Sequence, residues 1–205
     1  MSAATPAPPT LALAPGDTLR LRPTGRPGEL AVGRGTTEHG TVALRRWEVA
    51  IELDGAKLGA RIPEEDDAPT TLTDKAGGAV ARYEPGPAPA GRGGGGLLRR
   101  RRRPALRGGT LVVGEERYAL APADEDAPGA LTAADGTPVA TLRLNGEVLL
   151  VELAAPLAPA VAAFAGAVAL RALPPKPGRT YASMSTPSDN WASTTGSSPG
   201  GDGSP

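Results

Sequence analysis

The chain has 205 residues, and its 22 basic and 22 acidic side chains give a formal net charge of zero, which argues against a domain that binds polyanions over its whole surface. It has no Cys, which excludes disulfides, thiolate metal sites and a cysteine nucleophile. With one Phe, two Trp and three Tyr, the core of a single domain must be filled by Leu, Val and Ala.

The first sixteen residues, 1–16, are rich in Ala and Pro and lack periodicity, so we expect a disordered lead-in. They contain no Lys or Arg and no continuous apolar core, and we therefore expect no secretory signal and a cytoplasmic protein.

Short segments of alternating polarity then predict strands. The segment 47–53 places Trp47, Val49, Ile51 and Leu53 on one face, and Asp54-Gly55 predicts a hairpin turn after it. The predicted strands of this half are 18–22, 29–32, 41–44, 47–53 and 57–62, with a loop at 33–40 and an acidic loop at 63–69.

An internal repeat follows. LTDKAGGAVARY at 72–83 and LTAADGTPVATL at 131–142 share Leu, Thr, Gly, Val and Ala at matching positions. The turn and strand that begin at Asp54 resemble those that begin at Asp135. This self-similarity predicts a unit of strand, glycine turn and strand, used about three times.

The segment 84–96 is rich in Pro and Gly and predicts a long flexible loop. An arginine-rich segment, 97–107, comes next, and then an acidic loop at 123–129. Asn145-Gly146 predicts a type I′ turn. The strands predicted here are 110–113, 117–121, 139–144 and 147–153.

The stretch 157–173 is apolar all round and predicts a buried helix, with small side chains that let neighbours approach closely. A transmembrane span is the alternative, but the segment falls short of about 20 apolar residues and is mostly alanine. Residues 174–205 are Pro, Ser, Thr and Gly, and we expect a disordered tail.

Together these elements predict a mainly β domain at 17–173, an antiparallel barrel of about ten or more short strands around the buried C-terminal helix. The glycine-turn hairpins at 54, 77 and 135 and the strand EVLLVEL leading into the helix resemble the tubby C-terminal-like superfamily, which includes LURP-one-related and phospholipid-scramblase-like proteins. Similar domains bind phosphoinositides through basic surface residues, although no lipid-binding motif of theirs matches here, nor does the scramblase-like calcium segment.

Catalytic signatures are weak. No Ser lies between Ser2 and Ser183, and the only histidine, His39, has no partner in motif spacing. The acidic clusters at 64–67 and 124–126 lack EF-hand spacing, and the glycines at 91, 93 and 96 follow no strand. We therefore expect a protein that is not an enzyme and uses no cofactor or metal.

The arginine-rich segment is the candidate anion-binding site. Adjacent guanidiniums next to a glycine loop can grip the phosphates of anionic lipid head groups, which would make the protein peripheral at the membrane. Nucleic acid is the alternative partner, and a solvated loop is the non-functional interpretation. A protein partner is left unknown. The candidate residues are Arg99, Arg100, Arg101, Arg102, Arg103 and Arg107.

Overall fold

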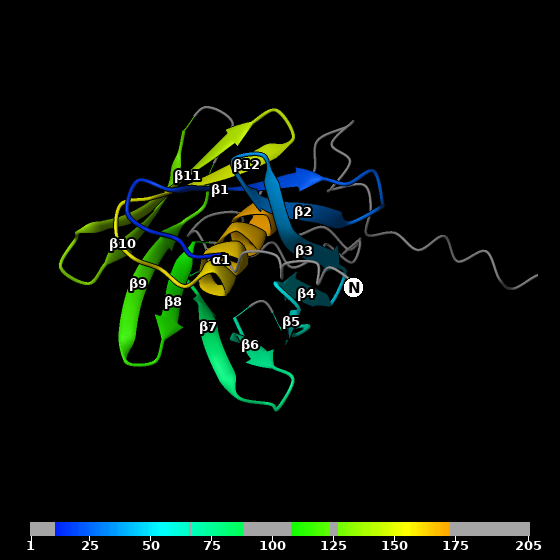
Figure 1. Ribbon diagram of the computed structural model, residues 1–205. Helices are drawn as coiled ribbons and strands as arrows, with labels where there is room; N and C mark the ends of the chain where they lie inside the picture. Colours follow the sequence, from blue (N-terminus) through cyan, green and yellow to red (C-terminus); the bar gives the residue numbers. More distant parts are fainter. Residues whose placement is uncertain (1–10, 66, 88–107, 124–126, 173–205) are drawn as a thin grey trace, which may run out of the picture.

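A computed structural model describes residues 11–65, 67–87, 108–123 and 127–172 (Figure 1). Within them, twelve strands form a closed antiparallel barrel, and one helix follows the last strand. Each strand pairs with the next along the chain and β12 pairs with β1, so the sheet has no open edge. The mainly β class and the antiparallel barrel are confirmed.

The strands are β1 (Thr18–Pro23), β2 (Glu29–Arg34), β3 (Thr37–Arg45), β4 (Glu48–Leu53), β5 (Ala56–Arg61), β6 (Thr70–Asp74), β7 (Ala79–Pro85), β8 (Gly109–Val113), β9 (Glu116–Ala121), β10 (Gly129–Ala133), β11 (Pro138–Asn145) and β12 (Val148–Leu153). The helix is α1 (Pro159–Ala172).

Strand alternation explains which side chains fill the barrel. In β1, Leu19 and Leu21 are fully buried, whereas Arg20 and Arg22, which alternate with them, are exposed on the outer wall. β12, which pairs with β1, repeats the pattern with buried side chains at every second position. Burial of each Leu or Val contributes about 1.5–3 kcal/mol, so the inward row of every strand favours closure around a common core.

The helix occupies the interior of the barrel (Figure 1). Every residue from 161 to 170 is buried, and α1 lies against β1, β3, β4 and β12. A Cβ on Gly166 would lie 3.2 Å from the Leu149 side chain and 3.3 Å from that of Leu21, so this glycine permits the close approach of helix and sheet. Within the described residues, no helix has the length and apolar character needed to cross a bilayer.

The helix begins two residues later than the sequence indicates. Leu157 is buried but precedes α1, and Pro159 is its first residue, a position at which proline costs no hydrogen bond. The carbonyl of Ala158 accepts hydrogen bonds from the N–H groups of Val161 and Ala162, at 2.9 and 3.0 Å. Residue 173 lies outside the described residues.

The barrel has two different ends. Because consecutive strands are antiparallel, the connections β2–β3, β4–β5 and β12–α1 lie at one end, which we call the entry end because the helix enters there. The connections β3–β4, β5–β6, β7–β8 and β9–β10 lie at the other, the exit end. Arg171, in the last turn of α1, confirms this arrangement, since its guanidinium donates to the Arg45 and Arg46 carbonyls of the β3–β4 turn.

The predicted repeat between 72–83 and 131–142 is confirmed by strand pairing. In β6–β7, Leu72 pairs with Ala81 and a bulge follows; in β10–β11, Leu131 pairs with Ala140 and the same bulge follows. The β2–β3 hairpin carries a third bulge, after Val32. The bulged hairpins therefore recur at every fourth strand, which divides the barrel into three similar units.

The similarity does not extend to the Asp54 turn. Asp54 and Gly55 are the two central residues of a tight turn, with φ of 47° and 82°, as a type I′ turn requires. The turn around Asp135 is longer, and only its Gly136 has positive φ.

Three further expectations are corrected. The lead-in expected at 1–16 does not extend to its last residues, since Leu11 is buried and contacts the barrel. The loop expected at 33–40 belongs largely to the β2–β3 hairpin, which turns at Gly35 and Thr36. The loop expected at 84–96 begins later, because β7 continues to Pro85 and pairs there with Gly109. Residues 88–96 lie outside the described residues.

Two turn residues also differ from expectation. Trp47 is a central residue of the β3–β4 turn instead of a core strand residue, since Arg45 pairs with Glu48 on either side of it. In the β11–β12 turn the central residues are Gly146 and Glu147, because Asn145 pairs with Val148. Positive φ at the first central residue, 61° at Gly146, fits a type II′ turn better than the predicted type I′.

Candidate functional site

The arginine-rich segment is inserted between two paired strands. Arg99–Arg103 and Arg107 lie outside the described residues, but the points where the segment leaves and rejoins the barrel are described. The Gly86 N–H donates to the Gly108 carbonyl at 2.8 Å, and the pairing continues inward through Pro85 and Gly109. The described residues that flank the segment therefore pair with each other at the exit end of the barrel.

An aromatic and cationic pair lies at the same end. The Arg46 guanidinium is 5.1 Å from the centroid of the Trp47 ring, within cation–π range, and both residues form the tip of the β3–β4 turn. Trp47 is partly exposed. A partly exposed tryptophan next to an arginine is a combination that proteins place at membrane interfaces.

The two acidic loops belong to the β5–β6 and β9–β10 connections, which lie at the same end. Asp66 and residues 124–126 lie outside the described residues. Among the residues described, no group of three His, Asp or Glu side chains is arranged to hold a metal ion.

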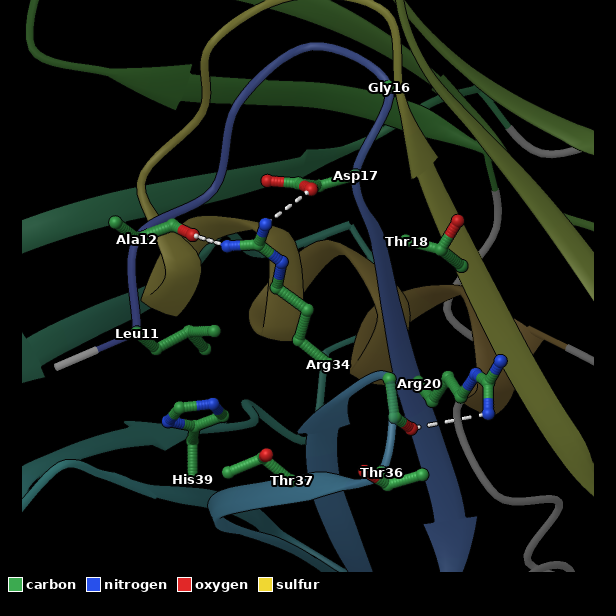
Figure 2. Close-up of a pocket in the computed structure, with 11 residues that line it drawn as sticks. Leu11, Ala12, Gly16, Asp17, Thr18, Arg20, Arg34, Thr36, Thr37 and His39 are labelled. Atoms are coloured by element: carbon green, nitrogen blue, oxygen red, sulfur yellow. Dashed lines mark hydrogen bonds and ion pairs between the residues drawn. The ribbon is translucent and has the colours of Figure 1, made fainter. Parts of the chain in front are cut away.

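A pocket of about 580 Å³ lies at the opposite, entry end (Figure 2). Its walls come from the β2–β3 hairpin, the start of β1 and residues 11–17, which we call the N-terminal strap. The lining residues are Leu11, Ala12, Gly16, Asp17, Thr18, Arg20, Arg34, Gly35, Thr36, Thr37 and His39.

Arg34 holds the strap in place. Because Arg34 is paired with the buried Leu19, it shares the inner face of the barrel, and its side chain is 48% exposed at the mouth. The guanidinium donates to the Ala12 carbonyl at 2.9 Å and forms an ion pair with Asp17, also at 2.9 Å. Asp17 in turn accepts a hydrogen bond from the Ala14 N–H. Figure 2 shows Arg20 on the other side of β1, its guanidinium turned to the Gly35 carbonyl.

His39 and Asp54 form a pair beneath the strap. The His39 Nδ1 atom lies 3.3 Å from Asp54 Oδ1, while the Leu11 N–H donates to Asp54 Oδ2 at 2.6 Å. The His39 side chain is only 9% exposed. The imidazole and the carboxylate are thus enclosed by the strap, with His39 and Thr37 on the side of the pocket that faces Arg34 (Figure 2).

Comparison of the three repeated units sets His39 apart. It is the bulged, unpaired residue of its hairpin, and the equivalent residues of the other two bulges are Val80 and Val139. The correspondence extends to the next strand, because the Asp54 N–H donates to the His39 carbonyl as the Ala154 N–H does to that of Val139. One unit therefore carries a histidine and an aspartate where another carries valine and alanine.

Tyr118 is a buried titratable residue whose pKa departs from its ordinary value. Burial, together with the hydrogen bond that its hydroxyl donates to Glu116, raises the pKa of Tyr118 to about 12. The phenol is therefore protonated at neutral pH. Neither Tyr118 nor Glu116 lines the entry pocket.

The structure thus defines a closed antiparallel barrel with an internal helix and a polar pocket at the entry end. In comparisons with known proteins, no family model, no curated protein and no solved structure matches the chain.

Proposed function

We propose that this protein is a non-enzymatic binding module that docks on anionic phospholipid surfaces with the exit end of its barrel. Arg99–Arg103 and Arg107 supply the attraction to lipid phosphates. The observation that supports the proposal is the position of Gly86 and Gly108, which flank the insertion in the chain and pair with each other at the same end of the barrel as the Arg46–Trp47 pair. An anionic surface that approaches this end meets cations and an interfacial aromatic side chain together.

The likeness to the tubby C-terminal-like superfamily supports the same interpretation, because a barrel closed around one helix is the architecture expected from that resemblance. Each Arg close to an anionic surface contributes about 1 kcal/mol, so five adjacent residues are sufficient for reversible attachment. The protein would then be cytoplasmic and peripheral at the membrane. Glu64 and Glu65, which are exposed in the β5–β6 loop of the same end, oppose attachment. The attraction of the arginines is screened by salt, so attachment should weaken as salt is added.

Replacing Arg99–Arg103 with Ser should abolish sedimentation with phosphatidylserine vesicles at about 50 mM salt, because the attraction is electrostatic. Replacing the same five residues with Lys provides a matched control, which keeps the charge and should keep sedimentation. Circular dichroism should show the same fold in both variants. Equal sedimentation of the Ser variant and the unaltered protein would overturn the proposal.

Duplex DNA is the competing ligand in this experiment. If binding to DNA exceeded binding to the vesicles and fell steeply with salt, the Arg segment would be assigned to nucleic acid instead. Binding to neither polyanion would leave a solvated loop.

A further inference from the structure

The entry pocket is separate from the docking surface proposed above, since it lies at the other end of the barrel. We propose that it binds a small organic phosphate, whose phosphate group lies between Arg34, Thr37 and His39. This site includes no residue of the arginine-rich insertion, so the test of this proposal does not depend on membrane docking.

Side chains that donate hydrogen bonds outnumber carboxylates in the lining of this pocket. A guanidinium has five N–H donors, and within the described residues Arg34 uses its own on the Ala12 carbonyl and Asp17. Arg20 on the rim donates to the Gly35 carbonyl and has no carboxylate partner among the described residues. The side chains of Thr18, Thr36 and Thr37 add hydroxyl donors, whereas Asp17 is the only carboxylate in the lining. An oxyanion satisfies such an excess of donors.

Contacts within the protein fix the direction of two side chains of this site. Asp17 and the Ala12 carbonyl fix the direction of the Arg34 guanidinium, and Asp54 fixes the ring of His39. The pocket volume of about 580 Å³ exceeds that of a phosphate ion and lies in the range of small-molecule sites. Leu11 and Ala12 of the strap offer an apolar wall. A phosphate attached to a small organic group therefore fits better than a bare ion.

The repeated units give the independent argument. Val80 and Val139 show that the bulge position accepts an apolar side chain in this fold, so His39 is not required there for packing. The polar pair His39–Asp54 occurs in the one unit whose hairpin also supplies Arg34 and Thr37 to the pocket. The unit that departs from the repeat is therefore the unit that lines the pocket.

The single histidine makes the test direct, because the imidazole region of a heteronuclear NMR spectrum of the full chain contains one His39 signal. Titration with glycerol 3-phosphate should move this signal along a saturable curve, whereas glycerol should leave it in place. Arg34→Gln should weaken binding at least about tenfold, since it removes a charged hydrogen-bond donor. Arg61→Gln, at the exit end, removes the same charge elsewhere and should bind as the unaltered protein does.

Asp17→Asn separates the ligand contact from the strap. This variant removes the negative charge beside Arg34 but keeps a side-chain oxygen that accepts from its guanidinium, so it should bind as tightly as the unaltered protein or more tightly. Equal weakening by Asp17→Asn and Arg34→Gln would overturn the proposed contact. A His39 signal that responds to phosphatidic acid vesicles but not to glycerol 3-phosphate would overturn a free small ligand, and no response to either would overturn the site.

Discussion

Ala163→Glu should lower the free energy of unfolding by at least about 3 kcal/mol, because the new carboxylate would lie in the core without a partner. Ala163 is fully buried in α1, as are Ala162 and Phe164 on either side of it. A loss of this size is a large part of the roughly 5–15 kcal/mol that keeps a domain folded. The yield of soluble protein should fall sharply, and urea unfolding of the soluble fraction measures the loss.

The matched control is Ala119→Glu, which introduces the same side chain on the exposed face of β9 and should change stability by no more than about 0.5 kcal/mol. If Ala163→Glu instead unfolded at the urea concentration of the unaltered protein, at least one face of the helix would be open to solvent. The helix would then not be enclosed by the barrel.

Gly40→Ala should destabilise the barrel by about 3 kcal/mol, at the upper end of ordinary overpacking, because the added methyl group meets backbone instead of a flexible side chain. A Cβ on Gly40 would lie 1.8 Å from the Glu52 carbonyl oxygen. β3 and β4 approach each other here through the pairing of Gly40 with Leu53, so either the pairing or the Asp54 turn beyond it must shift.

Gly59→Ala is the control for this prediction. Gly59 also lies within a paired strand, but a Cβ there meets nothing within 4 Å. Urea unfolding should show a lower midpoint for Gly40→Ala and no loss for Gly59→Ala. Equal midpoints for the two variants would contradict the close approach of β3 to β4.

Much of the fold could be predicted because several strands carry their own signal. The alternation in 18–22 and in 139–153 assigns the inward side chains correctly, and the apolar stretch after them requires an enclosing sheet. The tip of the β2–β3 hairpin could not be predicted in the same way. Its residues Arg34, Thr37 and Glu38 are exposed and polar, and they belong to strands because β2 and β3 pair with each other as far as Arg34 and Thr37.

The entry pocket was missed for a related reason. His39 has no partner at motif spacing, because Asp54 is fifteen residues away in the chain. Leu11 reaches the same carboxylate from the strap. Only closure of the barrel brings these segments together. A signal was nevertheless present in the repeat, because a polar residue stands where the other units have valine. For the arginine segment, the sequence supplies the charge, and the structure shows that the flanking residues Gly86 and Gly108 lie at the exit end.

The central claim, that the exit end meets an anionic membrane, is tested most directly by the fluorescence of Trp47. The chain has two tryptophans, so Trp191→Phe leaves Trp47 as the only reporter, at the tip of the β3–β4 turn. Phosphatidylserine vesicles with brominated acyl chains should quench its emission, while brominated phosphatidylcholine vesicles should not, and replacement of Arg99–Arg103 with Ser should remove the quenching. Protein that sediments with the anionic vesicles while Trp47 remains unquenched would contradict docking through this end.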